Sequence, residues 1–283
     1  MTRVPVVATI RDAYVFTATH LGGIIGLIWV PMVLVTILGF FSSQNLFNQS
    51  IEAMASGNAA HLGPALLLWL GYLLSALLLM AIMYVAVVQL ALGQRNAPSW
   101  AHFAFGAAEW RMLRALLSFV GLVIPVFFLG SILANGVAMR SLQAAPLASL
   151  LVYVVMLIFA ARFFLLLPAI SAMETEPVLR RAWQLSSGNF WPLFAVLMGF
   201  VVPLFLLFIL LMVPMASQIP PPPATSANLQ TQQLAMFVWL RQALPFLWGL
   251  LFFVWPLVIG LFSSASVSAW RTLKDKPSVD IES

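Results

Sequence analysis

Six runs of apolar residues, each long enough to cross a lipid bilayer, constrain this chain more than any other feature. A bilayer core is about 30 Å thick, so a helix rising about 1.5 Å per residue needs roughly 20 apolar positions to span it. The runs lack the alternation of polar and apolar residues that barrel strands require. The sequence therefore predicts an all-α, polytopic membrane protein with transmembrane helices at about 21–41, 64–90, 115–134, 147–168, 192–214 and 244–265.

Composition supports the same class. The chain is 63% hydrophobic and only 7% charged, far from the values of a soluble domain. The run at 21–41 is too long for the core of a signal peptide, and no small-residue cleavage site follows it, so we expect a retained helix. We expect one six-helix domain over 1–283 that ends in a short tail at 270–283. The lack of cysteine excludes disulfides and thiolate sites.

Basic residues lie in segments that alternate with segments almost free of positive charge. Ten of the thirteen are Arg3, Arg11, Arg95, Arg111, Arg114, Arg180, Arg181, Arg271, Lys274 and Lys276. Because cytoplasmic loops carry an excess of Lys and Arg, this pattern predicts cytoplasmic N- and C-termini and two cytoplasmic basic loops. Topology thus explains the net charge of +5, and we expect no nucleic-acid partner.

Three cytoplasmic segments have the pattern of amphipathic helices that lie in the membrane interface: 5–19, 99–114 and about 176–187. In the first, the predicted apolar stripe at helical spacing comprises Val7, Ile10, Tyr14 and Thr17. The segments between spans on the other side, at 42–63 and 217–232, are polar, and we expect them to form loops without a folded domain.

The third amphipathic segment is followed by Gly188, Asn189 and, two residues later, Trp191. Gly188 predicts a left-handed end of the helix, and Asn189 predicts a cap for the next one. Trp191 is expected at the membrane interface, where tryptophan is enriched.

Each amphipathic segment precedes a helix that crosses outward, which indicates a repeated unit of one interfacial helix and one transmembrane hairpin. Three of the runs share related segments: Gly26-Leu-Ile-Trp-Val-Pro31, Gly121-Leu-Val-Ile-Pro125 and Gly199-Phe-Val-Val-Pro203. All three run in the same direction, so the pattern predicts a threefold hairpin repeat about an axis along the membrane normal.

Arg162 is the one charged residue inside an apolar run. Burying an unpaired charge in a bilayer costs about 2.5–3.5 kcal/mol on insertion scales, so Arg162 is a candidate functional residue. Its side chain can instead snorkel to lipid headgroups from the cytoplasmic end of the helix, or pair with Glu174 or Gln89. We favour this structural or lipid-anchoring role over a role in transport.

Prolines near the middle of four runs support a second hypothesis, that of a transporter for small molecules or lipids. They are Pro31, Pro125, Pro203 and Pro256. Proline bends helices, as in the cavities of transporters. Proline is nevertheless common in transmembrane helices, and every Asp and Glu lies outside the six runs, which disfavours ion-coupled transport.

No catalytic constellation is recognisable in the sequence. His20, His61 and His102 lie in separate segments on both predicted sides of the membrane, so they do not indicate a metal site. Paired carboxylates and phosphate-binding glycine loops are also missing. We therefore expect no catalytic residue, metal or cofactor, and a lipid-modifying enzyme embedded in the membrane is the third hypothesis.

The segment that begins at Arg162 and continues from Glu174 to Trp191 resembles the membrane domain attached to some bacterial glycerophosphoryl diester phosphodiesterases. The pattern A-W-x-L-[ST]-x-G-N-x-W covers Ala182 to Trp191. The resemblance implies a polytopic inner-membrane protein in which this motif links the fourth and fifth helices. Because the six-helix module accounts for residues 1–283, no catalytic barrel is expected.

These observations together predict a non-enzymatic inner-membrane accessory or scaffold protein, associated with lipid at the cytoplasmic leaflet. The expected partners are membrane lipids with anionic headgroups, and a membrane protein or a second copy of the chain is also considered. The candidate headgroup cluster comprises Arg162, Glu174, Arg180, Arg181 and Trp183.

Overall fold

The computed structural model describes residues 3–58, 60, 62–94, 105–140, 145–216 and 229–274. Within these residues the chain is helical and contains no strand. The helices are α1 (Val6–Thr19), α2 (Leu21–Ser56), α3 (Leu62–Ala91), α4 (Ala107–Arg140), α5 (Ala145–Phe159), the π-helical turn η2 (Ala160–Phe164), α6 (Leu167–Met173), α7 (Val178–Ser186), α8 (Phe190–Ala216) and α9 (Leu229–Lys274).

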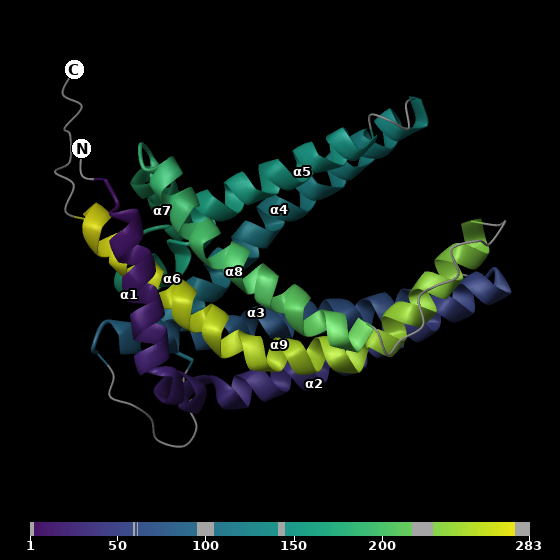
Figure 1. Cartoon of the computed structure of the whole chain (residues 1–283), viewed down its shortest axis with the longest axis horizontal. Coiled ribbons are helices and arrows are strands. Elements are labelled where there is room, and N and C mark those ends of the chain that lie inside the picture. The colour runs from purple at the N-terminus through teal and green to yellow at the C-terminus, as the bar shows by residue number, and fades with distance from the viewer. Residues whose placement is uncertain are drawn as a thin grey trace.

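The prediction of an all-α, polytopic membrane protein is confirmed. Six helical segments of the described chain are long and apolar enough to span a membrane: Leu21–Ser56, Leu62–Ala91, Ala107–Leu133, Leu150–Met173, Phe190–Val213 and Leu234–Lys274. The beginning of α1 and the end of α9 lie at the same end of the molecule (Figure 1), as an even number of spans requires.

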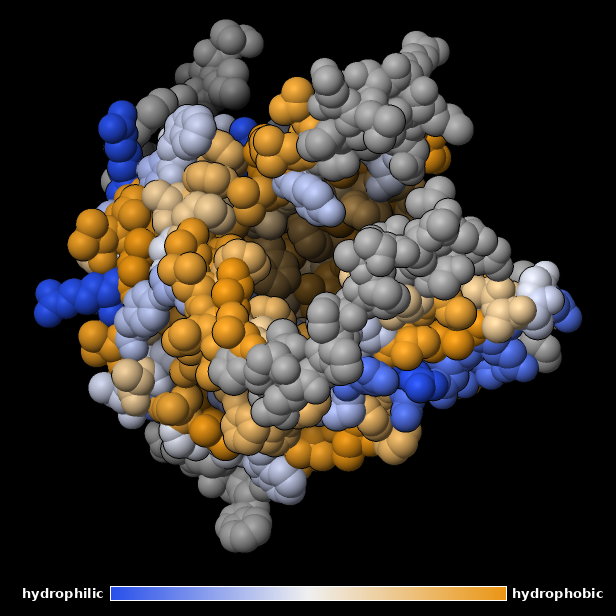
Figure 2. All heavy atoms as spheres, turned by 45° about the vertical axis from the view of Figure 1, so that its right-hand side comes forward, coloured by the Kyte–Doolittle hydropathy of each residue, from blue (hydrophilic) through white to orange (hydrophobic). Residues whose placement is uncertain are grey.

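The spans form two diverging arms (Figure 1). Helices α4 and α5 pack as one antiparallel arm, and α2, α3 and α9 form the other, with α8 running between them. Only 6% of the most apolar stretch of α4 is buried, and 17% of that of α8. Figure 2 shows apolar side chains over much of the visible face, which is hollowed on the side toward which the arms diverge.

Helices α2 and α9 extend well past the expected ends of their spans. The residues up to Ser56, which the sequence predicts as a loop from 42 onward, continue α2 as a helix. They pair with the first turns of α9, where Phe47 packs on Phe237 with ring centroids 5.7 Å apart and Arg241 Nη1 donates to Asn48 Oδ1 at 3.2 Å. The loop prediction for this segment fails because tertiary pairing stabilises a helix that hydropathy alone does not indicate.

Helix α1 forms as expected, but only part of the predicted stripe is buried. Thr17 of that stripe is buried together with Thr9 and Ala13, at intervals of four residues, whereas Val7 is 79% exposed. Small side chains let α1 approach α9 closely, and a Cβ added at Gly260 would lie 2.8 Å from Thr17 Cγ2. Helix α1 is therefore packed onto the bundle by its small residues.

The second expected amphipathic segment, 99–114, is described only from residue 105 onward. Outside the described residues lie His61, Arg95, His102 and the segments 217–228 and 275–283. The described part of 99–114 is not a separate helix, because α4 begins at Ala107 and continues directly into the span. Glu109 Oε2 accepts the backbone N–H of Gly106 at 2.9 Å and is buried at the start of this helix. The carboxylate thus satisfies a donor at the helix N-terminus.

The element order α1–α2–α3 and α7–α8–α9 gives two units of a short helix followed by two spans. The matching glycines occupy different environments, because a Cβ at Gly199 would meet Ile10 whereas a Cβ at Gly121 would meet nothing within 4 Å. The threefold repeat stays a prediction.

The four mid-span prolines do not share one environment. Pro31 and Pro256 are buried, whereas Pro125 and Pro203 are exposed on the outside of their helices. Each helix continues through its proline. The prolines therefore do not gather around one cavity.

Candidate functional site

The short helix α7 and its flanking segments hold most of the predicted site residues. Val178, Ala182 and Leu185 are buried at helical spacing and fasten one face of α7 to the bundle. Gly188 follows the helix in a left-handed conformation, with φ of 75°, as the sequence predicts. Asn189, before α8, uses its Oδ1 to accept the backbone N–H of Val4 at 3.4 Å, which links the start of the chain to this region.

Glu174 joins three parts of the chain. Its Oε2 accepts from Arg181 Nε at 2.8 Å, and its Oε1 accepts from the indole Nε1 of Trp270 at 2.7 Å. The Arg181 and Glu174 side chains are 28% and 14% exposed, so this ion pair is sheltered from water. Both carboxylate oxygens are engaged inside the protein, and Glu174 is therefore a structural link between α6, α7 and α9.

Arg162 lies in the π-helical turn η2 and points to aromatic rings. Its Cζ is 4.1 Å from the centroid of the Trp183 ring and 5.8 Å from that of Phe190. These distances are those of cation–π contacts. A π-helical turn holds an extra residue and shifts the faces of the helix on either side of it. Glu174 is one of the two partners that the sequence predicts for Arg162, but its carboxylate binds Arg181 and Trp270 instead.

Two exposed tryptophans belong to this region, one in contact with Arg162 and one packed on Phe190. Trp183 is 50% exposed and Trp191 is 73% exposed, and the rings of Phe190 and Trp191 pack edge to face with centroids 5.2 Å apart. We call Arg162, Trp183, Phe190 and Trp191 the aromatic–arginine surface. A hollow of about 300 Å³ adjoins it, lined by Arg3, Gly188, Phe190, Trp191 and Pro192, so a second cation lies beside the same rings.

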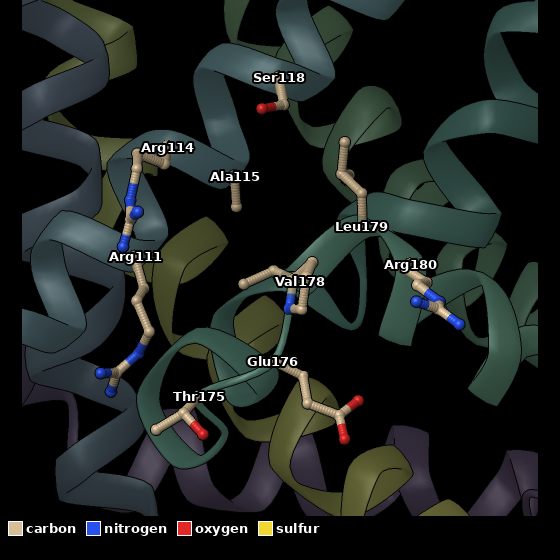
Figure 3. A pocket seen from close by; sticks show the side chains of 10 residues that line it. Arg111, Arg114, Ala115, Ser118, Thr175, Glu176, Val178, Leu179 and Arg180 are labelled. Carbon is tan, nitrogen blue, oxygen red and sulfur yellow. The ribbon is translucent and has the colours of Figure 1, made fainter.

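A separate cleft of about 420 Å³ opens between the first turns of α4 and the start of α7. Figure 3 shows Arg111 and Arg114 of α4 on one side of it and Arg180 of α7 on the other, with Glu176 on the connecting segment. Arg111 Nε donates to the backbone carbonyl of Ser171 at 3.0 Å. The cleft is therefore lined by three cationic side chains and one carboxylate.

The predicted five-residue cluster thus separates into three groups. Glu174 and Arg181 form the internal link, Arg162 and Trp183 belong to the aromatic–arginine surface, and Arg180 lines the cleft. Whether any of them contacts a headgroup stays a prediction.

Sequence reasoning did not place Arg111, Arg114 or Trp270 in the site. Arg111, Arg114 and Ser118 are spaced so that they share one face of a helix, and this pattern could have identified them as a group. No local pattern indicates Trp270, because its partner lies 96 positions away in the chain.

Among the residues that the structure describes, no group of three or more His, Asp or Glu side chains could hold a metal ion. His20 stacks on Phe16 with ring centroids 4.6 Å apart, which accounts for its position at the end of α1.

No family model, curated protein or solved structure matches this chain. The resemblance of the segment from Arg162 to Trp191 to a phosphodiesterase membrane domain stays a prediction.

Proposed function

We propose that this membrane protein is a non-enzymatic accessory or scaffold whose aromatic–arginine surface binds anionic phospholipid headgroups at the cytoplasmic leaflet of the inner membrane. The observation that carries the proposal is the placement of Arg162, which lies within a membrane-spanning segment with its guanidinium 4.1 Å from the centroid of the Trp183 ring.

The energetics of Arg162 favour a ligand from outside the protein. Among the described residues, Arg162 contacts aromatic rings and has no carboxylate partner. A cation–π contact contributes about 0.5–2 kcal/mol but supplies no hydrogen-bond acceptor for the guanidinium N–H groups. Stacking leaves the N–H groups at the edge of the guanidinium plane free to donate, and phosphate oxygens are well matched to that fork.

The surroundings support the same ligand. Trp183 and Trp191 are the amphipathic, exposed aromatic residues that prefer the headgroup region. Arg3 lies in the adjoining hollow beside Phe190, and each basic residue near an anionic membrane surface adds about 1 kcal/mol of attraction. The alternating basic segments of the sequence are the support for the cytoplasmic orientation.

The test compares Arg162→Leu with the matched variant Arg241→Leu, which removes an arginine from the far end of α9. After purification in a neutral detergent, native mass spectrometry measures the phosphatidylglycerol that remains bound. We expect Arg162→Leu to reduce it about tenfold, since a charge-assisted contact contributes about 1.5–3 kcal/mol. Arg241→Leu should retain it.

Arg162→Lys keeps the charge but loses the planar fork, so we expect an intermediate loss. This variant serves if Arg162→Leu fails to fold. Unchanged bound lipid in a folded Arg162→Leu protein would refute the proposal.

A lipid carrier is the second candidate, and the diverging arms favour it. The poorly buried spans α4 and α8 border the hollowed apolar face (Figures 1 and 2), and such a surface suits acyl chains better than a polar solute. Reconstitution into vesicles with a fluorescent phospholipid in one leaflet tests it. If the fluorescent phospholipid moves between the two leaflets no faster than in protein-free vesicles, this function is excluded.

A further inference from the structure

We infer that the cleft between α4 and α7 is a second anion-binding site, separate from the aromatic–arginine surface, that takes the phosphate group of a phosphate ester. Three arginines line it, namely Arg111, Arg114 and Arg180. The inference does not depend on the proposed role of Arg162, because Arg162 is not part of the lining.

The dimensions and charge of the cleft fit such a ligand. Its volume of about 420 Å³ lies within the range of roughly 300–1,000 Å³ that is usual for small-molecule sites. The lining holds three arginines and a single carboxylate, that of Glu176. The cleft therefore carries an excess of positive charge that a phosphate would neutralise.

Arg111 is held in place before any ligand arrives. Its Nε donates to the carbonyl oxygen of Ser171 at 3.0 Å, which fixes the plane of the guanidinium. The terminal nitrogens, which carry four of the five N–H donors of the group, are left for other acceptors. A fixed donor loses less conformational entropy on binding than a free side chain does.

Further donors line the same cleft. The hydroxyl groups of Ser118 and Thr175 belong to it, and so does the beginning of α7. The backbone N–H of Arg181 donates to the carbonyl oxygen of Pro177, which is the first hydrogen bond of the helix. No side chain caps the start of α7. The N–H groups of the first turn add a positive end to a site that the arginines already define.

Glu176 lowers the affinity of the cleft for an anion, and this effect can be tested. A carboxylate in the lining repels an anion, so the affinity for phosphate is lower than the arginines alone would provide. Glu176→Gln should therefore bind phosphate more tightly than the native protein, which a merely structural role of this residue does not predict.

The experiment uses the full chain in a neutral detergent and two probes. Isothermal titration calorimetry measures binding of inorganic phosphate, and native mass spectrometry measures retention of phosphatidylglycerol. Arg114→Gln and Arg180→Gln change exposed side chains of the cleft, and we expect each to weaken binding of the effective probe about tenfold. Arg271→Gln changes an exposed arginine outside the cleft lining and should bind as the native protein does.

The two probes separate the sources of the phosphate. Calorimetric binding that the cleft variants weaken, with unchanged lipid retention, identifies a soluble phosphate ester. Lipid retention that the cleft variants lose, while Arg162→Leu leaves the cleft-dependent part intact, identifies a headgroup held in the cleft. The inference is overturned if neither probe responds to Arg114→Gln, Arg180→Gln or Glu176→Gln in folded protein. Loss with Arg162→Leu alone would support the aromatic–arginine surface and refute the cleft.

Discussion

The indole Nε1 of Trp270 donates a hydrogen bond to Glu174 Oε1 at 2.7 Å, which ties the last turns of α9 to the segment between α6 and α7. The other carboxylate oxygen of Glu174 accepts from Arg181. The carboxylate therefore connects the final span to the helix on which both candidate sites depend.

Trp270→Phe should lower the stability of the protein while leaving the ring volume largely filled. The change removes a donor to a sheltered carboxylate, and a hydrogen bond to a charged group contributes about 1.5–3 kcal/mol. Thermal unfolding in detergent micelles measures the loss. Trp191→Phe is the matched control, since Trp191 is exposed, and equal melting temperatures for the two variants would contradict the assignment.

Gly260→Ala should separate α1 from α9. The added Cβ would lie 2.8 Å from Thr17 Cγ2 and 2.9 Å from Thr17 Oγ1, and overpacking of this kind costs about 1–3 kcal/mol. The second change Thr17→Ala removes both atoms and should restore much of the stability. Gly121→Ala is the control, because its Cβ would meet nothing within 4 Å. A double variant no more stable than Gly260→Ala would show that this contact is not the cause.

Trp183→Leu should release Arg162, whereas Trp183→Phe should keep part of the contact because phenylalanine also presents a π face. The cation–π interaction contributes about 0.5–2 kcal/mol, with tryptophan the best partner. A double-mutant cycle with Arg162→Leu, read out by thermal unfolding, isolates the pairwise energy. A coupling energy near zero would mean that the close approach of 4.1 Å contributes nothing to stability.

Burial raises the pKa of Tyr14, in α1 outside the spans, above its ordinary value of 10.0. The folded protein therefore keeps this proton at a pH where the unfolded chain has released it. The unfolded state then binds fewer protons, so the contribution of Tyr14 is lost as the pH rises through and above about 10.

Tyr14→Phe should make the decline in stability above pH 10 shallower. It also removes the hydrogen bond from Tyr14 Oη to the carbonyl of Gly199, which is 3.0 Å long. Melting temperatures between pH 8 and pH 11 give the two slopes. Parallel slopes for the native and variant proteins would show that Tyr14 does not contribute to the pH dependence.

The candidate site shows which contacts the sequence can predict and which it cannot. The sequence identifies Arg162, Glu174, Arg180, Arg181 and Trp183 as one cluster because they lie close together in the chain. Helix α7 carries only Arg180, Arg181 and Trp183, on different faces. Helix α4 adds Arg111 and Arg114 to the cleft, and α9 supplies Trp270 as a partner of Glu174. Proximity in sequence therefore predicts the region but not the pairing.

The sequence by itself determined that this is an all-α protein with six spans, because transfer of a helix into a bilayer depends on the apolar content of about 20 consecutive residues. Only the tertiary structure decided how far α2 and α9 extend, which face of α1 is buried and which partner each arginine meets. Those outcomes depend on side chains from distant parts of the chain, whose shapes and donors must fit one another, and hydropathy carries no record of that fit.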